Sequence, residues 1–348
     1  ILLLQDSVFN AGGEALAPFQ SNYLARPQNG AAAIHFPYSF FTASNTGVPS
    51  GFDLNNDGAV GGGQDALGFG EFPGQYGMVL LSRFPIDTRR TRTFRAFLWR
   101  DMPGALLPDD PATPQEADWY SREELAVLPL SSKSHWDVAV RIGRLTLHVL
   151  ASHPTPPAFD GPEDRNGRRN HDEVRFWTDY LTRGPATYIR DYAGRRGGLG
   201  RGPFVILGDQ NSDPADGESL HGAILALLAH RRLGPGFTPV SEGAVDASVE
   251  QGGANLTQRS DPRFDTADFT DRHAGNLRVD YALASRELGV CGAGVFWPGR
   301  GEHGADLVWG DPPPSSDHRL VWLDITPGAG QCPRDSDPTA IVTSRPRP

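Results

Sequence analysis

The residues from Phe204 to Pro214, FVILGDQNSDP, place a carboxylate and a carboxamide at the end of an apolar run. Side chains two residues apart on an extended chain point to the same side. Asp209 and Asn211 can therefore both reach one hard cation or one phosphate oxygen, and Gly208 lets a ligand approach the backbone closely. Because Asp and Asn are also common in turns, an ordinary turn at the end of the strand is the alternative interpretation.

Four more apolar runs end in, or contain, a polar side chain suited to the same chemistry. Asp6 ends the run ILLLQD, and His153 ends HVLASH. Asp280 lies inside VDYALA, where an unpaired carboxylate is costly, and a histidine such as His318 would suit it as a partner. Asp317 and His318 precede RLVWLDI and could supply a metal ligand and a proton-transfer group. Each of these positions taken alone also has a purely structural explanation.

Taken together, the groups are carboxylates, an amide and imidazoles. Such a set suits Mg²⁺ or Mn²⁺ rather than a soft metal. The sequence has no cysteine cluster or His-rich spacing typical of structural zinc. It therefore predicts metal-dependent chemistry at a phosphoryl group, with the five segments meeting around one cation once the chain is folded.

The elements that must position these groups are strands in both hairpin and helix-crossed contexts. Gly143-Arg144 between two apolar runs predicts a β-hairpin, and Asn170 with Glu173 resembles a capping box that starts a helix. Apolar runs predict strands at residues 1–4, 31–41, 78–86, 90–99, 134–142, 144–153, 203–207, 278–285 and 319–325, with helices at 15–25, 119–128, from about 170, and 219–233. This pattern favours one α/β domain over residues 1–326, with two packed mixed sheets and helices outside, followed by a tail at 327–348.

Composition limits the partners. The formal net charge of −10 makes the chain a poor general binder of duplex nucleic acid. No run of 18 apolar residues occurs, so we expect no transmembrane segment. Cys291 and Cys332 are either two buried thiols or one disulfide that ties the C-terminal tail to the body.

Six segments, in this order, resemble the endonuclease/exonuclease/phosphatase superfamily, which includes deoxyribonuclease I, inositol polyphosphate 5-phosphatases and sphingomyelinases. They are ILLLQD, GMVLLSRFPI, LASHPTPP, VILGDQNSDP, LRVDYALAS and SDHRLVW. The resemblance implies a four-layer α-β-β-α sandwich with two mixed β-sheets. It also implies hydrolysis of a phosphomonoester or phosphodiester by in-line attack of water, with Mg²⁺ or Mn²⁺ as cofactor.

The resemblance assigns roles to individual residues. Asp209 and Asn211 would position the attacking water and the phosphate, and His153 would stabilise the transition state or assist the leaving group. His318, oriented by Asp280, would act as a base or polarise the phosphate.

The metal would be held by Asp317 and by Asp6, which stands where the family usually has Glu. The family's first strand carries an active-site Asn, and we expect that strand to lie upstream of Ile1.

Two further sets of residues are candidates for binding. Arg168, Arg169 and Asn170 could clamp an anionic substrate, and the segment SSKSHWD offers Lys133 and His135. Solvated or structural side chains are the alternative for all of them.

Asp53, Asn55 and Asp57 before Gly58 match the start of a calcium loop, although the closing Glu is absent and Asp65 falls close to its place. A plain Asx-rich loop is the alternative to a Ca²⁺ site.

The expected function is a metal-dependent phosphoesterase acting on a small or lipid-like phosphate ester. A nuclease acting on DNA or RNA, a non-catalytic binding protein on the same fold and a calcium-stabilised adhesion module are the alternatives. The segment HPTPPAFDGPEDRNGRRNHDEVRFW looks like a bacterial, often exported subgroup. We therefore expect a monomer in the periplasm or outside the cell, with a cytoplasmic location as the alternative.

Overall fold

The computed structural model describes residues 1–28, 30–235, 237–310, 313–329 and 332. They form two compact units. Unit 1 comprises Ile1–Gly202 and Leu207–Asn211, and unit 2 comprises Pro203–Ile206 and the residues from Ser212 onward. The strand β7 (Phe204–Asp209) runs from unit 2 into unit 1.

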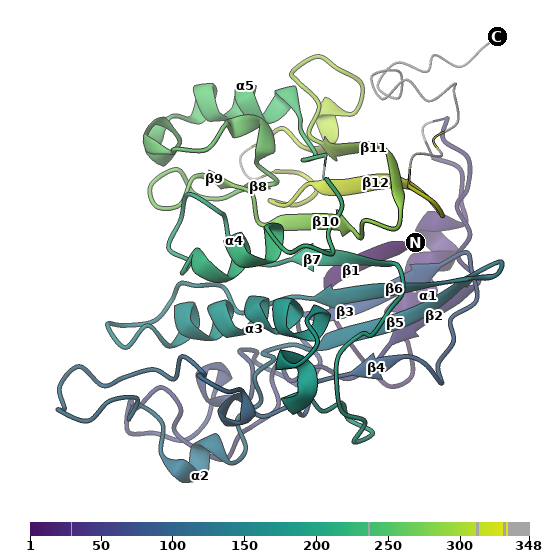
Figure 1. The fold of residues 1–348 in the computed structure, drawn as a ribbon. Helices are drawn as coiled ribbons and strands as arrows, with labels where there is room; N and C mark the ends of the chain where they lie inside the picture. The colour runs from purple at the N-terminus through teal and green to yellow at the C-terminus, as the bar shows by residue number, and fades with distance from the viewer. Residues whose placement is uncertain (29, 236, 311–312, 330–331, 333–348) are drawn as a thin grey trace. The chain divides into compact units, whose positions relative to one another are not determined.

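Unit 1 contains two antiparallel sheet regions (Figure 1). In one, β3 lies between β1 and β2, and all six β3 residues are buried, as expected for an uninterrupted apolar run. In the other, β5 lies between β4 and β6, and the end of β7 lies beside β6. The strands are β1 (Leu2–Ser7), β2 (Tyr38–Phe41), β3 (Gly77–Ser82), β4 (Arg92–Thr93), β5 (His135–Ile142) and β6 (Leu145–Ser152).

The long helix α3 (Arg165–Leu181) builds the core of unit 1. Its Phe176 and Tyr180 make edge-on ring contacts with Phe94 and stack on each other, and Trp177 packs on the His135 ring. The other helices of this unit are short: α1 (Leu16–Pro18), the π-helix Phe19–Leu24, α2 (Arg122–Leu125), and 3₁₀ turns at Gly63–Asp65, Trp99–Asp101 and Pro185–Tyr188.

Unit 2 is built on β10 (Asp280–Ala284) beside the start of β7, and on the antiparallel pair β11 (Gly289–Phe296) and β12 (Leu320–Thr326). A two-residue pair joins β8 (Ala267–Asp268) and β9 (Asn276–Leu277). The helices are α4 (Gly222–Leu228) and α5 (Glu242–Gln251), with 3₁₀ turns at Gly253–Thr257, Pro262–Phe264 and Ala305–Leu307.

The sequence predicted some of these elements and missed others. The β5–β6 hairpin is confirmed, with Gly143 at φ +60° in its turn. The strand predicted over residues 90–99 is wrong beyond Arg92–Thr93, and the helix α3 begins at Arg165 rather than near Asn170. The helix α5 and the strand β11 were not predicted, because small residues interrupt the apolar pattern: Gly, Ala and Ser in α5, and Gly and Ala in β11.

Cys291 and Cys332 form a disulfide, with their Cα atoms 5.3 Å apart, so this one of the two alternatives is confirmed. Within the described part of the chain, no helix combines the length and apolarity needed to cross a membrane.

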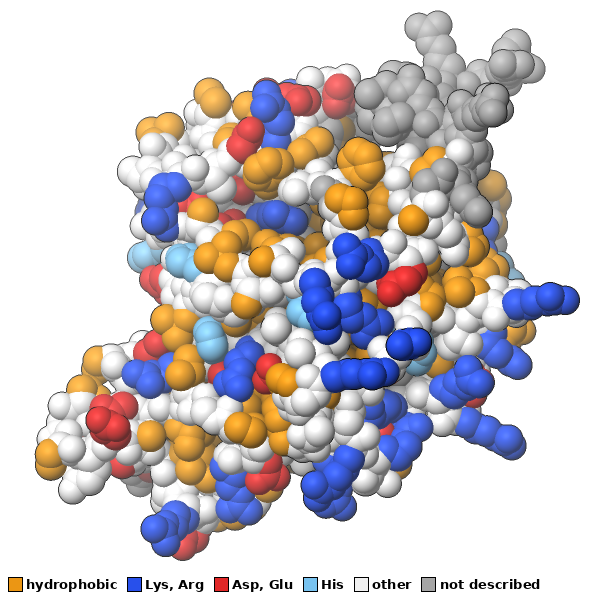
Figure 2. All heavy atoms as spheres, viewed as in Figure 1, with side chains coloured by type: hydrophobic (Ala, Val, Ile, Leu, Met, Phe, Trp, Pro, Cys, Tyr) orange, Lys and Arg blue, Asp and Glu red, His pale blue; other side chains and the backbone are white. Residues whose placement is uncertain are grey.

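An arginine-rich face covers part of unit 1. Figure 2 shows Lys and Arg side chains gathered over β4 and the tip of the β5–β6 hairpin. Hydrogen bonds place these segments side by side, because Arg90 Nη1 donates to Thr146 Oγ1 and Arg195 Nη1 donates to the Arg89 carbonyl. We define the face by its exposed members, which are Arg89, Arg90, Arg141, Arg144, Arg190 and Arg196. Of these six, only Arg90 has a carboxylate of the described residues within 4.0 Å, that of Asp87.

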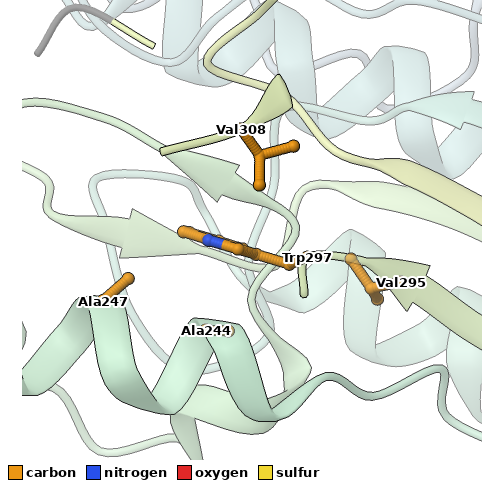
Figure 3. Close-up of a cluster of buried hydrophobic side chains, with 5 residues drawn as sticks. All are labelled: Ala244, Ala247, Val295, Trp297 and Val308. Atoms are coloured by element: carbon orange, nitrogen blue, oxygen red, sulfur yellow. The ribbon is translucent and has the colours of Figure 1, made fainter. Parts of the chain in front are cut away.

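The core of unit 2 depends on Trp297, which is buried against Ala244 and Ala247 of α5 and against Val295 and Val308 (Figure 3). We predict that Trp297→Ala lowers the free energy of unfolding by about 3–5 kcal/mol, because it leaves a large cavity. Urea unfolding followed by far-ultraviolet circular dichroism measures this. Val249→Ala on the exposed side of α5 is the control, since Val249 is 74% exposed, and equal losses for both variants would contradict the prediction.

Candidate active site

The end of β7 is fixed by close backbone packing at Gly208. A Cβ atom there would lie 2.1 Å from the Ser152 carbonyl oxygen of β6, and the residue has φ +138°, so only glycine fits. The expectation that Gly208 leaves room for a ligand is therefore wrong, because the neighbouring strand occupies that space. The close packing sets the register that brings Asp209 to the end of β6.

Asp209 and Asn211 contact each other at the end of β7, and their role at a common site stays a prediction. The Asp209 Oδ1 atom accepts a hydrogen bond from the Asn211 backbone N–H at 2.6 Å. Asn211 takes up the left-handed conformation, φ +49°, which Asn tolerates better than most residues. Its Nδ2 atom donates to the Pro154 carbonyl at 3.1 Å. The chain therefore turns at the end of β7, as the alternative interpretation expected, and the turn forms part of the site.

His153 lies between two carboxylates. Its Nε2 atom is 3.3 Å from Asp209 Oδ2, and its Nδ1 atom is 3.7 Å from Asp6 Oδ1. Within the described residues, Nδ1 has no hydrogen-bond partner. The His153 and Asp209 side chains are each 6% exposed and the Asp6 side chain is 56% exposed. The cluster thus opens to solvent on the Asp6 side.

Gln5 holds this cluster together, and the sequence analysis missed it. Its Nε2 atom donates to the Ser152 carbonyl at 3.2 Å, and its Oε1 atom accepts from the Asp209 backbone N–H at 2.7 Å. A glutamine inside the apolar run LLLQD was the available signal, because a polar side chain in a buried strand needs partners.

Three residues predicted to bind substrate lie in the interior instead. Asn170 Nδ2 donates to the carbonyls of Thr155, Gln210 and Asn211. The Arg169 guanidinium donates to three more carbonyls, those of Leu67, Pro129 and Leu130.

The third of these residues, His135, is 0% exposed and contacts Ser131 Oγ and the Glu173 carbonyl. Burial lowers the pKa of His135, which favours the neutral ring. All three side chains are buried and bonded to neighbouring protein groups, and a substrate-binding role for Arg169, Asn170 and His135 stays a prediction. Arg168 is half-buried and donates to the Leu107 carbonyl, and its role stays a prediction.

The capping box predicted at Asn170 and Glu173 is also wrong. Both residues lie inside α3, and the Glu173 carboxylate accepts hydrogen bonds from Ser132 and from the Thr155 backbone N–H. Both side chains form hydrogen bonds with distant loops and do not cap the helix terminus.

Unit 2 holds the second group, in which Asp280 and His318 form the predicted pair. The His318 Nδ1 atom is 2.9 Å from Asp280 Oδ2. Thr266 Oγ1 donates to the same oxygen at 2.9 Å and accepts from the backbone N–H groups of Val279 and Asp280. Sequence analysis missed Thr266, since nothing in its local context links it to Asp280.

The segment 265–269 also holds the chain around His318. Ala267 forms a β-bridge with His318, and the Phe269 ring meets the His318 ring edge-on. Asp268 pairs with the buried Arg319 at 2.7 Å, and its backbone N–H donates to the Asp317 carbonyl. Asp317 itself is exposed, so its carboxylate is accessible to a cation.

By donor type, the carboxylate oxygens in each unit suit a hard divalent ion. Unit 1 offers carboxylate oxygens of Asp6 and Asp209, and unit 2 offers those of Asp280 and Asp317. The orphaned Nδ1 atom of buried His153 is a further donor or acceptor without a protein partner among the described residues. The assignment of catalytic and metal-binding roles stays a prediction for all of these residues.

The proposed calcium loop is folded by its own hydrogen bonds. Asp53 accepts from the backbone N–H groups of Asp57 and Gly58, and Asp57 accepts from that of Ala59. Asp65 Oδ1 and Oδ2 accept from Leu54 and Gly61. These contacts agree with an Asx-rich loop, and Ca²⁺ binding by Asp53, Asn55 and Asp57 stays a prediction.

Asp265, next to Thr266, is a strongly perturbed acid of unit 2. It is 0% exposed, and within the described residues neither carboxylate oxygen has a hydrogen-bond partner. Burial, together with the nearby carboxylates of Asp213, Asp216 and Asp261, raises its pKa to about 8. The folded protein therefore favours the protonated acid.

This gives a pH prediction for stability. The pKa is higher in the folded state than the ordinary 3.8, so the contribution of Asp265 to stability is complete below about pH 4 and is lost as pH rises toward 8. We expect Asp265→Asn to remove this fall, so that its melting temperature gains on the wild type as pH rises from 4 to 8. Thermal unfolding across that range tests it, with exposed Asp306→Asn as control, and a difference that does not change with pH would refute it.

Comparison with known proteins agrees with the order of the sequence motifs. A sequence model of the Endonuclease/Exonuclease/phosphatase family matches residues 1–318. No curated protein has a match to the chain. The family match and the mixed helices and sheets confirm the predicted deoxyribonuclease I-like α/β fold class.

Several solved structures are similar. The endonuclease/exonuclease/phosphatase from Beutenbergia cavernae has 17% identity and a TM-score of 0.45, covering 91% of this chain and 56% of that one. Sphingomyelinase C from Streptomyces griseocarneus has 15% identity and a TM-score of 0.38, covering 94% and 85%. The mannosyl-6-phosphatase of Bacteroides thetaiotaomicron has 12% identity and a TM-score of 0.33, covering 83% and 78%. The chain thus spans little more than half the length of the Beutenbergia protein, and similarity this low carries no argument about substrate.

Proposed function

We propose, because the chain belongs to the endonuclease/exonuclease/phosphatase family, that it hydrolyses a phosphate ester with the help of a divalent metal ion. The observation that carries the proposal is the cluster in unit 1. There, one carboxylate, Asp209, both contacts the His153 imidazole and fixes the Asn211 backbone. A histidine held between carboxylates beside an oriented amide can manage protons and charge at phosphorus.

Mg²⁺ or Mn²⁺ is the metal that the donor set suits, with Asp6 and Asp317 as the proposed ligands. Such an ion, when bound, neutralises charge on the phosphoryl oxygens and lowers the pKa of a coordinated water. Both carboxylates are exposed enough to be reached from solvent.

The residues of unit 1 would orient the reacting groups. Asp209 Oδ1 accepts from the Asn211 backbone N–H, and Oδ2 lies 3.3 Å from His153 Nε2, where it would orient the imidazole or a water molecule. The Asn211 amide is anchored through Pro154, so its position is set before substrate arrives. His153 in its protonated form would donate to a phosphoryl or leaving-group oxygen.

The pair in unit 2 would supply the second proton-handling group. Because Asp280 Oδ2 contacts His318 Nδ1, the carboxylate fixes the ring orientation and favours a proton on Nδ1. Nε2 is then the atom that accepts a proton or polarises an oxygen. Thr266 keeps the carboxylate in place for this role.

The proposed substrate is a small or lipid-like phosphomonoester or phosphodiester, since the net charge of −10 disfavours long polyanions. The disulfide supports a proposed location in an oxidising compartment, in the periplasm or outside the cell. Action as a monomer and assignment to an exported bacterial subgroup are parts of the same proposal.

We expect His153→Ala and Asp209→Ala each to lower kcat on an aryl phosphate ester by about 10²–10⁴-fold, because each removes a group that manages protons or charge. The assay uses Mg²⁺ or Mn²⁺ with chromogenic mono- and diesters, and activity should vanish when EDTA removes the metal. Exposed His303→Ala is the matched control. No wild-type activity would favour the non-catalytic binding protein instead, and activity that survives either substitution would contradict the proposed role of that residue.

A nuclease is the second candidate, favoured by the arginine-rich face defined above. Arginine forks bind phosphate groups bidentately, and six exposed arginines in adjacent segments form a local positive surface on an acidic chain.

The two functions predict different results with nucleic acid. For the favoured function, we expect the small esters to be hydrolysed much faster than a plasmid at low salt. For the nuclease, Arg141→Gln with Arg144→Gln should weaken duplex binding and reduce the slope of log K against log salt by about 2. The rate on small esters should not change in that variant. Rapid plasmid cleavage that depends on these arginines would overturn the preference for small substrates.

A further inference from the structure

Lys133 is the one lysine in a chain with 32 basic residues. It lies just before β5 in unit 1 and is only 6% exposed. Lysine is rarely buried unless it has a partner or a function. A lysine on the surface needs no explanation, but the buried position of Lys133 does.

The contacts of Lys133 link it to the candidate site. Its Nζ atom donates to the Pro154 carbonyl at 3.2 Å, and the same oxygen accepts from Asn211 Nδ2 at 3.1 Å. One carbonyl oxygen thus joins the ammonium to the amide that the proposed reaction uses. Pro154 directly follows His153, so the ammonium also lies next to the histidine loop.

The surroundings of Lys133 are acidic, but it forms no close ion pair. Burial lowers the pKa of Lys133, and the carboxylates of Glu173, Asp6 and Asp209 oppose that effect. Within the described part of the chain, no carboxylate lies within 4.0 Å of Nζ, and Pro154 is its single hydrogen-bond partner. An ammonium has three N–H donors, so two of them have no protein acceptor there.

Glu173 is not free to neutralise it. Its Oε1 atom accepts from the backbone N–H and the hydroxyl of Ser132, and its Oε2 atom accepts from the Thr155 backbone N–H. Glu173 thereby fixes the two loops on either side of Lys133. The carboxylates of Asp6 and Asp209 also act on the ammonium through space.

We propose that Lys133 is an electrostatic positioning residue of the phosphoryl site. It holds the carbonyl that anchors Asn211, and it supplies a fixed positive charge that favours a phosphoryl group in front of Asp209. The inference rests on the proposed function and extends it, because a fixed cation of this kind favours substrates with more negative charge. Lys133 acts through Pro154 and through space.

The test compares three variants with the wild type. Lys133→Met keeps the shape and removes both the charge and the donor, Lys133→Gln keeps a donor without charge, and Lys133→Arg keeps both in a larger group. We expect Met and Gln each to lower kcat on aryl phosphates by about 10²-fold. Arg should retain more activity than Gln.

Esters of different charge distinguish an electrostatic role of Lys133 from a purely structural one. Coulomb energy scales with the charge of the ligand, so Lys133→Gln should lose more on a dianionic aryl monoester than on a monoanionic bis-aryl diester. Equal losses on both esters, or a Gln variant as active as the wild type, would overturn the proposal. Melting temperatures confirm that each variant is folded, and Gln takes the place of Met if the latter is not.

Binding of inorganic phosphate, measured by calorimetry with and without Mn²⁺, separates this inference from the proposed function. We expect Lys133→Gln to bind phosphate at least tenfold more weakly. If the wild type is inactive but shows this difference, the hydrolase proposal fails and the role of Lys133 stands. If the wild type is active and phosphate binds both proteins equally, the role of Lys133 fails and the hydrolase proposal stands. A wild type that neither hydrolyses the esters nor binds phosphate overturns both.

Discussion

The arrangement of the site in unit 1 depends on the amide of Gln5, which joins the ends of three strands. It donates to the Ser152 carbonyl of β6 and accepts from the Asp209 backbone N–H of β7, while belonging itself to β1. Each residue of the cluster follows from one of these contacts: Asp6 is next to Gln5, His153 is next to Ser152, and Asp209 is bonded directly. The separations of 3.3 and 3.7 Å around His153 therefore come from strand register rather than from attraction between the side chains. This is the pre-organisation that electrostatic catalysis requires.

In unit 2, a hydroxyl group has the positioning role that the Gln5 amide has in unit 1. Thr266 Oγ1 accepts from two backbone N–H groups and donates to Asp280, which in turn holds His318. In each unit a polar side chain, half-buried Gln5 or buried Thr266, links backbone groups to a candidate site residue, because a polar group left without partners in the interior would cost free energy. Removing Gln5 or Thr266 would therefore disturb a functional residue without touching it, which makes such residues hard to recognise by chemistry alone.

What the sequence predicted, and what it did not, follows from how local each signal is. The β5–β6 hairpin and the polar ends of the strands were predictable, because apolar periodicity and turn residues are properties of adjacent positions. The pairing of Asp280 with His318 was predictable too, because a carboxylate inside an apolar strand needs a partner. The interior positions of Arg169, Asn170 and His135 were not predictable, because each side chain bonds to a carbonyl far away in sequence: carbonyls of loops for Arg169 and Asn170, and the Glu173 carbonyl of α3 for His135. Spacing along a helix contains no information about those contacts, so a buried clamp and an exposed substrate ligand look alike in sequence.

The buried arginines and the buried lysine of this chain differ in how many protein groups they bind. Buried Arg169 binds three carbonyls, and the Arg92 guanidinium contacts Asp191, the Tyr180 hydroxyl and the carbonyls of Gly197 and Arg195. A planar fork with five donors suits such cross-linking. Lys133, by contrast, has one carbonyl partner and two N–H donors without an acceptor among the described residues. An ammonium group that bonds to one carbonyl contributes little to cross-linking loops. Its burial costs free energy. Under the proposed role, an anion that reaches this site would explain why Lys133 is buried against the carbonyl that anchors Asn211.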